Sequence, residues 1–251
     1  MLLQRITAKL RNLSRRFPRH VVCNVCGWWG RRFDSDQWHP YTICWQCHSM
    51  VRHRLFVETW NRIEGLRYQD IIEGKRILHF APEEQTTRLL KPRAGQYRTA
   101  DFMLDNVDEK LNLCDMPTIK DDSVDLLIVA DVLEHVPDHL QAMREILRVL
   151  SPGGRALITV PQKDNLEKTF GDPIITDPRE RERLFGQTDH VRIFGNDMKE
   201  LLESVGFKVR VISAEDFPPD IVKRHVLFPP VLSTHPLATN HRRVYFARKP
   251  V

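Results

Sequence analysis

The order of apolar and polar positions between residues 123 and 161 predicts a strand, a helix and a second strand. Residues 126–130 form an apolar run that is long enough for a strand buried on both faces and too short for a helix. After Asp138, apolar side chains recur three and four residues apart, which is the spacing of one helix face. The Ser-Pro-Gly-Gly sequence at 151–154 should end that helix, and residues 156–160 form the second buried run. Strands joined in this way are expected to be parallel, with a right-handed crossover.

Further apolar runs extend this unit to a doubly wound α/β sheet of seven strands. The additional strands are expected at residues 76–81, 97–101, 111–113, 207–212 and 244–248, the last of them antiparallel. A periodic pattern at 55–72 and alternating charges at 177–183 predict helices, and Asp197 with Glu200 predicts a capping box for another.

Four cysteines near the N-terminus have the spacing of a zinc site. Cys23 and Cys26 form one C-x-x-C pair, Cys44 and Cys47 form the other, and seventeen residues separate the pairs. Two disulfides are the alternative, but the absence of a secretory signal favours a reducing compartment and therefore Zn²⁺. Four thiolates would close the coordination shell, so the expected role of the metal is structural.

The positive charge of the chain is concentrated in its first twenty residues. The net charge is +5, whereas residues 1–20 carry six basic residues and no acid, so the remainder sums to −1. Residues 1–20 are expected to form a basic amphipathic helix that docks on its own domain; contact with an anionic membrane or with RNA, and a mitochondrial presequence, are the alternatives. No apolar run approaches the ~18 residues of a membrane span, so a cytoplasmic protein is expected.

Two stretches resemble a known family. The sequence DLLIVADVLEHV at 125–136, followed by REILRVLSPGGRALITVP at 144–161, resembles the fourth and fifth strands of class I S-adenosylmethionine-dependent methyltransferases of the type 11 branch. The cysteine pairs with residues 49–55, HFAPE at 79–83 and DHVRIFG at 189–195 resemble a bacterial group of that branch with an N-terminal zinc ribbon, although His48 stands where that group has glycine.

The resemblance implies a Rossmann-like seven-stranded methyltransferase sheet with a small N-terminal zinc ribbon. The corresponding layout is a basic arm at 1–20, a zinc ribbon at 21–54, a helical linker at 55–74 and a catalytic domain at 75–251 with an insertion at 161–195. The RHR sequence at 52–54 could be a solvated helix face or could point from the ribbon toward the substrate.

The cofactor expected from the resemblance is S-adenosyl-L-methionine. No glycine occurs between Gly74 and Gly95, which argues against a dinucleotide because a pyrophosphate needs close backbone approach. Asp101, twenty residues after Ala81, suits a ribose hydroxyl. The implied cofactor residues are His79, Phe80, Ala81, Glu83, Asp101, Phe102, Asp115, Met116, Ala130, Asp131, Val132 and His135. A degenerate domain that binds no cofactor is the alternative.

The acceptor side is expected in the insertion. His190 could act as a general base, Asp189 could orient an imidazole or bind a substrate hydroxyl, and Arg192 could bind an anionic group of the acceptor. Alternatively, the three residues form an ion-paired network that fixes the insertion.

The favoured function is methyl transfer to a small-molecule or saccharide hydroxyl, because the body of the chain carries no excess of positive charge. An RNA base methyltransferase that grips RNA with the ribbon and arm, and a non-catalytic zinc-containing interaction module, are the alternatives. The sequence indicates neither the acceptor nor the oligomeric state.

Overall fold

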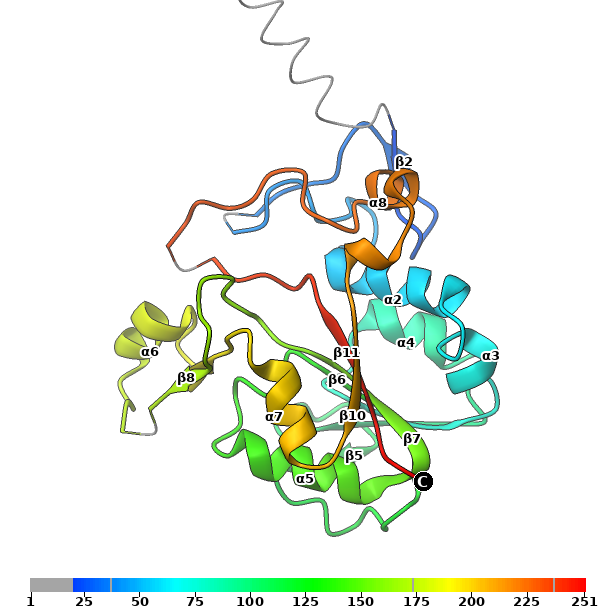
Figure 1. Ribbon diagram of the computed structural model, residues 1–251, viewed down its shortest axis with the longest axis vertical. Coiled ribbons are helices and arrows are strands. Elements are labelled where there is room, and N and C mark those ends of the chain that lie inside the picture. Colours follow the sequence, from blue (N-terminus) through cyan, green and yellow to red (C-terminus); the bar gives the residue numbers. More distant parts are fainter. Residues whose placement is uncertain (1–19, 37, 173, 237) are drawn as a thin grey trace, which may run out of the picture.

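A seven-stranded sheet forms the centre of the molecule in the computed structural model, which describes residues 20–36, 38–172, 174–236 and 238–251 (Figure 1). The predicted basic arm therefore lies outside the described residues, apart from His20. The strand order is β10-β11-β7-β6-β3-β4-β5. The strands are β3 (Arg76–Phe80), β4 (Gln96–Asp101), β5 (Glu109–Lys110), β6 (Val124–Ala130), β7 (Leu150–Thr159), β10 (Lys208–Ile212) and β11 (Val244–Arg248).

The five strands from β7 to β5 are parallel, and β11 is antiparallel to both of its neighbours. The predicted β6–helix–β7 crossover and the antiparallel last strand are thus confirmed. The third strand differs, because residues 109–110 form it and the predicted run 111–113 lies directly after it, where the amide of Leu111 still donates to the carbonyl of Asp101 in β4. Leu111 and Leu113 instead follow the strand and pack in the core. An apolar run indicates which residues are buried, and here the buried residues are not the ones that form the strand.

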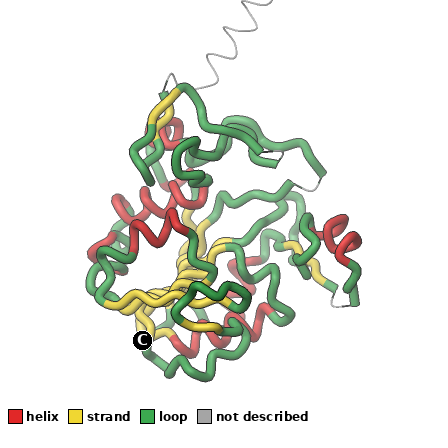
Figure 2. Tube along the Cα trace, turned by 180° about the vertical axis from the view of Figure 1, so that it is seen from behind, coloured by secondary structure: helices red, strands yellow, loops and turns green. Residues whose placement is uncertain are grey.

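Helices cover both faces of the sheet, and the alternation of side chains along the strands explains why. Leu127 and Val129 of β6 face one buried cluster, which includes residues of α5 (His139–Val149) and α7 (Met198–Ser204). Leu126 and Ile128 face the other, which includes residues of α2 (Val51–Arg62), α3 (Tyr68–Ile71) and α4 (Glu84–Leu90). The strands run between these two helical layers (Figures 1 and 2).

The start of the strand after α5 and the cap of α7 differ from the prediction. α5 starts after Asp138, whose side chain accepts from the amide of Gln141, and it ends at Val149, so that residues 151–154 already belong to β7. The predicted capping box at Asp197 is wrong. Its Oδ1 accepts from the amide and the hydroxyl of Thr169 instead, which attaches the insertion to the start of α7.

The N-terminal cysteine region packs against elements from both ends of the chain. Its strands β1 (Val21–Val22) and β2 (Trp29–Gly30) form a two-stranded antiparallel sheet. After β10 the chain forms a short 3₁₀ turn (Ala214–Asp216) and α8 (Pro219–His225), which lies beside this region (Figure 1). His225 Nδ1 donates to the carbonyl of Val22 over 2.8 Å. Residues 214–226, named here the C-terminal segment, therefore cover the ribbon.

The insertion after β7 forms a small unit of its own. β8 (Phe170–Gly171) and β9 (Arg192–Ile193) pair antiparallel, with α6 (Pro178–Phe185) between them in sequence, at the place where alternating charges predict a helix. Asp177 caps α6 and Gly186, at φ 92°, ends it. Within the described residues, no helix is long and apolar enough to cross a membrane.

Candidate active site and metal centre

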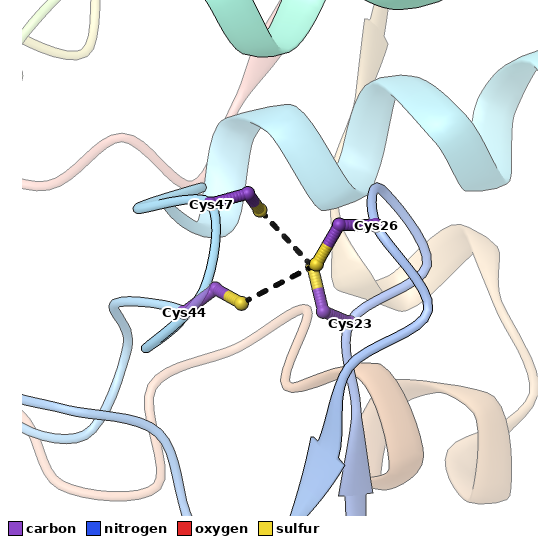
Figure 3. Close-up of side chains that lie close together, drawn as sticks. All are labelled: Cys23, Cys26, Cys44 and Cys47. Carbon is purple, nitrogen blue, oxygen red and sulfur yellow. Dashed lines mark hydrogen bonds between the residues drawn. The ribbon is translucent and has the colours of Figure 1, made fainter.

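The four cysteines of the ribbon converge at one point (Figure 3). Their sulfur atoms all lie within 4.8 Å of one another, with 3.7 Å between Cys23 and Cys47 and 3.7 Å between Cys26 and Cys44. A tetrahedral zinc ion with Zn–S bonds of about 2.3 Å places its sulfurs about 3.8 Å apart, so the cluster fits zinc.

Each knuckle turns through a residue in the left-handed region of backbone space. Gly27 follows the first pair at φ 81°, and His48 follows the second at φ 56°. Glycine adopts this conformation freely and histidine does so at a cost. The departure from glycine noted at position 48 therefore retains the backbone of the turn and adds modest strain.

The first turn of α2 connects this region to the edge of the central sheet. Arg52 Nη2 lies 2.6 Å from Glu83 Oε1, Arg52 Nε lies 3.3 Å from Asp131 Oδ2, and His53 Nε2 lies 2.8 Å from Glu83 Oε2. Both Arg52 and His53 are buried. They are not a solvated helix face, because they bind the carboxylates of Glu83 after β3 and Asp131 after β6.

The hydrogen bonds of His53 define its tautomer. Its Nδ1 accepts from the amide of Met50, so Nε2 carries the proton that is donated to Glu83. Burial, followed by the charge of Arg52, lowers the pKa of His53. The imidazole is therefore neutral near pH 7 and acts as a hydrogen-bond donor to the carboxylate.

Two residues at this edge have strained backbone. Ala81 and Asp131 directly follow β3 and β6, which are neighbours in the sheet, and their φ angles are 46° and 56°. Asp131 accepts from the hydroxyl of Thr159 (2.9 Å) and lies 3.3 Å from Nδ1 of His241. Burial raises the pKa of Asp131, but Arg52 and His241 outweigh it, and the pKa lies well below its usual range. Strain of this kind concentrates at functional sites.

Glu83 makes the stability of this edge sensitive to acid. Burial raises its pKa, but Arg52 and His53 outweigh burial and lower the pKa to about 2. A carboxylate whose pKa is lowered by folding stabilises the fold above its unfolded pKa, and that stability is lost as the pH falls from about 4.5 toward 2.

We therefore expect Glu83→Gln to flatten the pH dependence of unfolding. Its free energy of unfolding should be lower than that of the wild type at pH 6, because Arg52 loses a partner, and should fall less steeply between about pH 5 and 3. Urea unfolding at a series of pH values measures both. Glu84→Gln, in an exposed pair with Arg88, is the matched control and should keep the wild-type slope. Equal slopes for all three proteins would contradict the role assigned to Glu83.

Ten of the twelve predicted cofactor residues fall into three sets, and His79 and His135 lie outside them. Ala81, Glu83, Asp131 and Val132 lie half-buried at the carboxyl edge of the sheet. Phe80, Met116 and Ala130 are core residues, so only their backbone could contact a ligand. Asp101, Phe102 and Asp115 lie farther along the edge, where Asp101 Oδ1 accepts from the amides of Met103 and Leu104, and Phe102 is exposed.

His79 differs from the expectation that it lines the pocket. Its side chain is fully buried, and Nδ1 pairs with the hydroxyl of Tyr97 at 2.7 Å. No partner for Nε2 occurs among the described residues. Burial lowers the pKa of His79 to about 4. Its position one residue before the end of β3 explains the difference, because the side chain remains within the packed layers.

A cavity of about 410 Å³ lies beside the strained edge. Four parts of the chain enclose it: the ribbon, the segment after β6, the insertion and the segment before β11. The lining residues are Trp38, His39, Asp131, Glu134, His135, Pro161, Glu182, Phe185, Gly186, Gln187, Thr188, His190, Thr239 and His241.

Two predicted site residues, His135 and His190, line this cavity, and Asp189 contacts His135. His190 is buried and donates from Nδ1 to the carbonyl of Phe185 (3.1 Å). His135 packs edge-on against it, with 4.8 Å between ring centroids. Asp189 is exposed, and its Oδ2 lies 3.2 Å from Nδ1 of His135. Asp189 was expected beside the imidazole of His190, and the imidazole that it contacts is that of His135.

Arg192 holds the loop after β6. Its guanidinium donates to the carbonyls of Leu133, Val136 and Pro137 over 2.5 to 2.8 Å, and the side chain is buried. The predicted contact with an anionic acceptor does not fit, because these donors already serve the backbone. Arg192 instead fixes the segment that carries Glu134 and His135.

Sequence reasoning missed three residues of the site. Glu134 stands in the quoted LEHV motif, and its place beside His135 was an available signal. His39 and His241 line the cavity from irregular segments, where no periodicity marks them. Burial, followed by the charge of Asp131, raises the pKa of Glu134 well above its usual value.

Comparison with known proteins agrees with the fold. Residues 77–158 match the family described as Methyltransferase domain. A relative from Mycolicibacterium smegmatis, named a probable S-adenosylmethionine-dependent methyltransferase, is 32% identical over 99 residues, which are 39% of this chain and 34% of that protein. The chain thus spans about a third of the length of this relative.

Solved structures share the architecture at low sequence identity. A Haemonchus contortus phosphoethanolamine N-methyltransferase bound to S-adenosylhomocysteine aligns with a TM-score of 0.51 at 15% identity, covering 80% of this chain and 53% of that one. The [4+2]-cyclase SpnF aligns with a TM-score of 0.50 at 13% identity, covering 88% and 86%. Residues 77–158 thus match a methyltransferase domain, and the solved structures share the fold of the sheet; the cyclase shows that this fold also supports other chemistry.

Proposed function

We propose that this chain transfers the methyl group of S-adenosyl-L-methionine to a hydroxyl of a small-molecule or saccharide acceptor. The observation that carries the proposal is the methyltransferase-domain match at 77–158, whose strand ends adjoin a polar cavity. A cavity of about 410 Å³ suits a small molecule. Outside residues 1–20 the net charge is −1, which argues against a backbone-binding RNA surface.

The cofactor would lie along the carboxyl edge of β3, β4 and β6. When bound, it supplies an electrophilic methyl group on a sulfonium. The residues present fit it: Asp101 keeps one carboxylate oxygen beyond the two amide bonds made by the other, Phe102 offers an exposed apolar ring, and the half-buried backbone at 81–83 needs no glycine because no phosphate approaches it.

We expect Asp101→Ala to weaken S-adenosylmethionine binding by about 1–3 kcal/mol, since a carboxylate accepting from ribose hydroxyls forms a charge-assisted bond. Isothermal titration calorimetry measures the affinity. Asp105→Ala removes an exposed acid from the same loop and should leave the affinity unchanged. Equal affinities for both variants and the wild type would place the ribose elsewhere.

The acceptor would occupy the cavity beside His135 and His190. Burial lowers the pKa of His190, so its imidazole is neutral near pH 7, and donation from Nδ1 to Phe185 leaves the lone pair on Nε2. That nitrogen could take the proton of an acceptor hydroxyl while the edge aligns the oxygen with the methyl group. Asp189 and Arg192 act as positioning residues.

The test is labelling of cell extracts with methyl-labelled S-adenosylmethionine, followed by mass spectrometry. A small labelled product should appear with the wild-type protein. With His190→Ala it should fall by about 100-fold or more, while cofactor affinity and melting temperature stay close to wild type. Label in RNA, together with salt-sensitive RNA binding, would show that the acceptor is RNA and not a small molecule. An absence of cofactor binding would indicate a non-catalytic interaction module.

Zinc in the four-cysteine cluster completes the proposal. Its four thiolates leave no open position, so the ion would hold the fold of the ribbon and take no part in methyl transfer.

A further inference from the structure

A second group of metal-ligand side chains lies at the wall of the cavity. Glu134, His135 and His190 each offer a ligand atom, and these atoms lie within 4.8 Å of one another. Glu134 and His135 come from the loop after β6, whereas His190 comes from the insertion after α6. Glu134 and His190 are buried, and His135 opens toward the cavity. The side chains therefore converge from two segments that are distant in sequence.

Both imidazoles are oriented as metal ligands usually are. His190 donates from Nδ1 to the carbonyl of Phe185, and Nδ1 of His135 lies 3.2 Å from the carboxylate of Asp189. Partners of this kind hold the proton on Nδ1 and leave the Nε2 lone pair free for a metal. Nε2 of His135 lies 4.0 Å from Oε1 of Glu134, a separation that an ion between the two atoms would span.

Glu134 has a feature that the general-base role of His190 does not explain. Its side chain is 1% exposed, and its buried Oε2 has no hydrogen-bond partner among the residues that the structure describes. Arg192 is near, but its guanidinium donates to backbone carbonyls of residues 133–137. A buried carboxylate oxygen with no partner is costly, and a cation removes that cost.

The loop that carries the carboxylate is also rigidly held. The three bonds from Arg192 fix the backbone on both sides of Glu134, and the amide of Val191 donates to the carbonyl of Glu134 over 2.9 Å. The same short segment, 189–192, thus supplies His190 and fixes its partner. A ligand set that is held in advance by such contacts is what a metal site requires.

We propose that Glu134, His135 and His190 bind a divalent transition-metal ion at the wall of the cavity, separate from the four-cysteine cluster. Two imidazoles and one carboxylate suit Zn²⁺, Co²⁺, Ni²⁺, Fe²⁺ or Mn²⁺ and contrast with the four thiolates of the ribbon. Three protein ligands leave coordination positions open, as in catalytic sites. Resting on the proposed function, we infer that an acceptor hydroxyl occupies one of them. Nε2 of His190 would then be a ligand and could not also take the hydroxyl proton, so the ion would replace His190 in this role by lowering the pKa of the bound hydroxyl, whose proton would pass to solvent water.

The experiment is a titration with Co²⁺ of protein loaded with one equivalent of zinc, enough for the ribbon alone, followed by calorimetry and by visible absorption. One further equivalent should bind with the weak absorption of a nitrogen and oxygen site, whereas intense thiolate bands would report exchange in the ribbon. Glu134→Gln and His190→Ala should each weaken binding by at least about 100-fold, and Asp189→Asn by about 10-fold. Glu182→Gln, at the same cavity but outside the ligand set, is the matched control and should bind as the wild type does.

Two results would overturn the proposal: no Co²⁺ uptake outside the ribbon at millimolar concentration, or uptake that Glu134→Gln leaves unchanged. Melting temperatures accompany each variant, and the near-isosteric Glu134→Gln decides the matter if His190→Ala does not fold. The titration contains neither S-adenosylmethionine nor acceptor. A failure of the metal site is thus distinguishable from a failure of the proposed methyl transfer.

Discussion

Replacing Cys44 by serine should remove the metal from the ribbon and unfold residues 21–50. Structural zinc sites of this type contribute about 10–16 kcal/mol of apparent binding free energy, which is also folding free energy. The apolar cluster of the ribbon cannot substitute for it, because three of its eight buried members are themselves the ligands Cys23, Cys44 and Cys47. Metal content by mass spectrometry and limited proteolysis of the reduced protein measure the two effects.

The fifth cysteine provides a matched control. Cys114 lies outside the cluster, with its thiol donating to the carbonyl of Asp138, so Cys114→Ser should keep one zinc ion in the ribbon. The measurements belong in a Glu134→Gln background, where the second group of ligands cannot contribute. Full zinc retention by Cys23→Ser/Cys44→Ser in that background would show that the cluster does not bind the metal.

Loss of the ribbon metal should also destabilise the carboxyl edge of the central sheet. α2 begins directly after the second knuckle, and its first turn supplies Arg52 and His53 to Glu83 and Asp131. Unfolding of the ribbon would remove these partners from the two carboxylates, one of which, Asp131, is itself a strained residue of the edge. The four-cysteine cluster and the candidate active site are therefore linked through a single helical turn.

The sequence predicts the framework of the molecule because its signals are local. The apolar run at 126–130 is a strand because it is buried on both faces, and the helix after Asp138 follows from its apolar spacing and its cap. The cysteine pairs predict their cluster because two short knuckles with this spacing can close around one ion. Each inference depends on residues that are near one another along the chain.

The partners of charged residues were not predictable in this way. The RHR sequence at 52–54 follows a helical pattern, and charged residues on a helix are usually solvated. All three side chains are buried here, and their partners are distant in sequence. Glu83 lies 31 residues from Arg52, and His225, whose carbonyl binds Arg54, lies 171 residues from it. Likewise, Arg192 binds carbonyls 55 to 59 residues away, where a local pattern suggested an anionic ligand.

Arg54 is the most deeply embedded of these residues. It is fully buried, and it donates to the carbonyls of Ser49 and Thr42 in the ribbon, of His225 at the end of α8 and of Val226 directly after it. Within the described parts of the chain it forms no ion pair with a carboxylate. Burial lowers its pKa to about 10, against the charges of Cys23, Cys44 and Cys47. With zinc bound, the thiolates of the cluster would serve as its counter-charge.

Arg54→Met should be one of the most destabilising single substitutions in the protein, at about 3–5 kcal/mol. Methionine keeps apolar contact with Phe33 but leaves four carbonyls without their donor, three of them in buried bonds, and each buried unsatisfied acceptor costs about 1–3 kcal/mol before the structure relaxes. The substitution also removes the cation beside the thiolates, so the ribbon should release zinc to a chelator faster than the wild type does.

Urea unfolding and the rate of zinc transfer to a chromogenic chelator measure these effects. Arg88→Met, which breaks an exposed pair with Glu84, should change stability by no more than about 0.5 kcal/mol and leave the rate of zinc release unchanged. Arg54→Lys should fall between the two, because a single ammonium group cannot reach carbonyls that a planar guanidinium contacts from three nitrogens. Wild-type stability in Arg54→Met would mean that the ribbon and the C-terminal segment are held together by their apolar contacts alone.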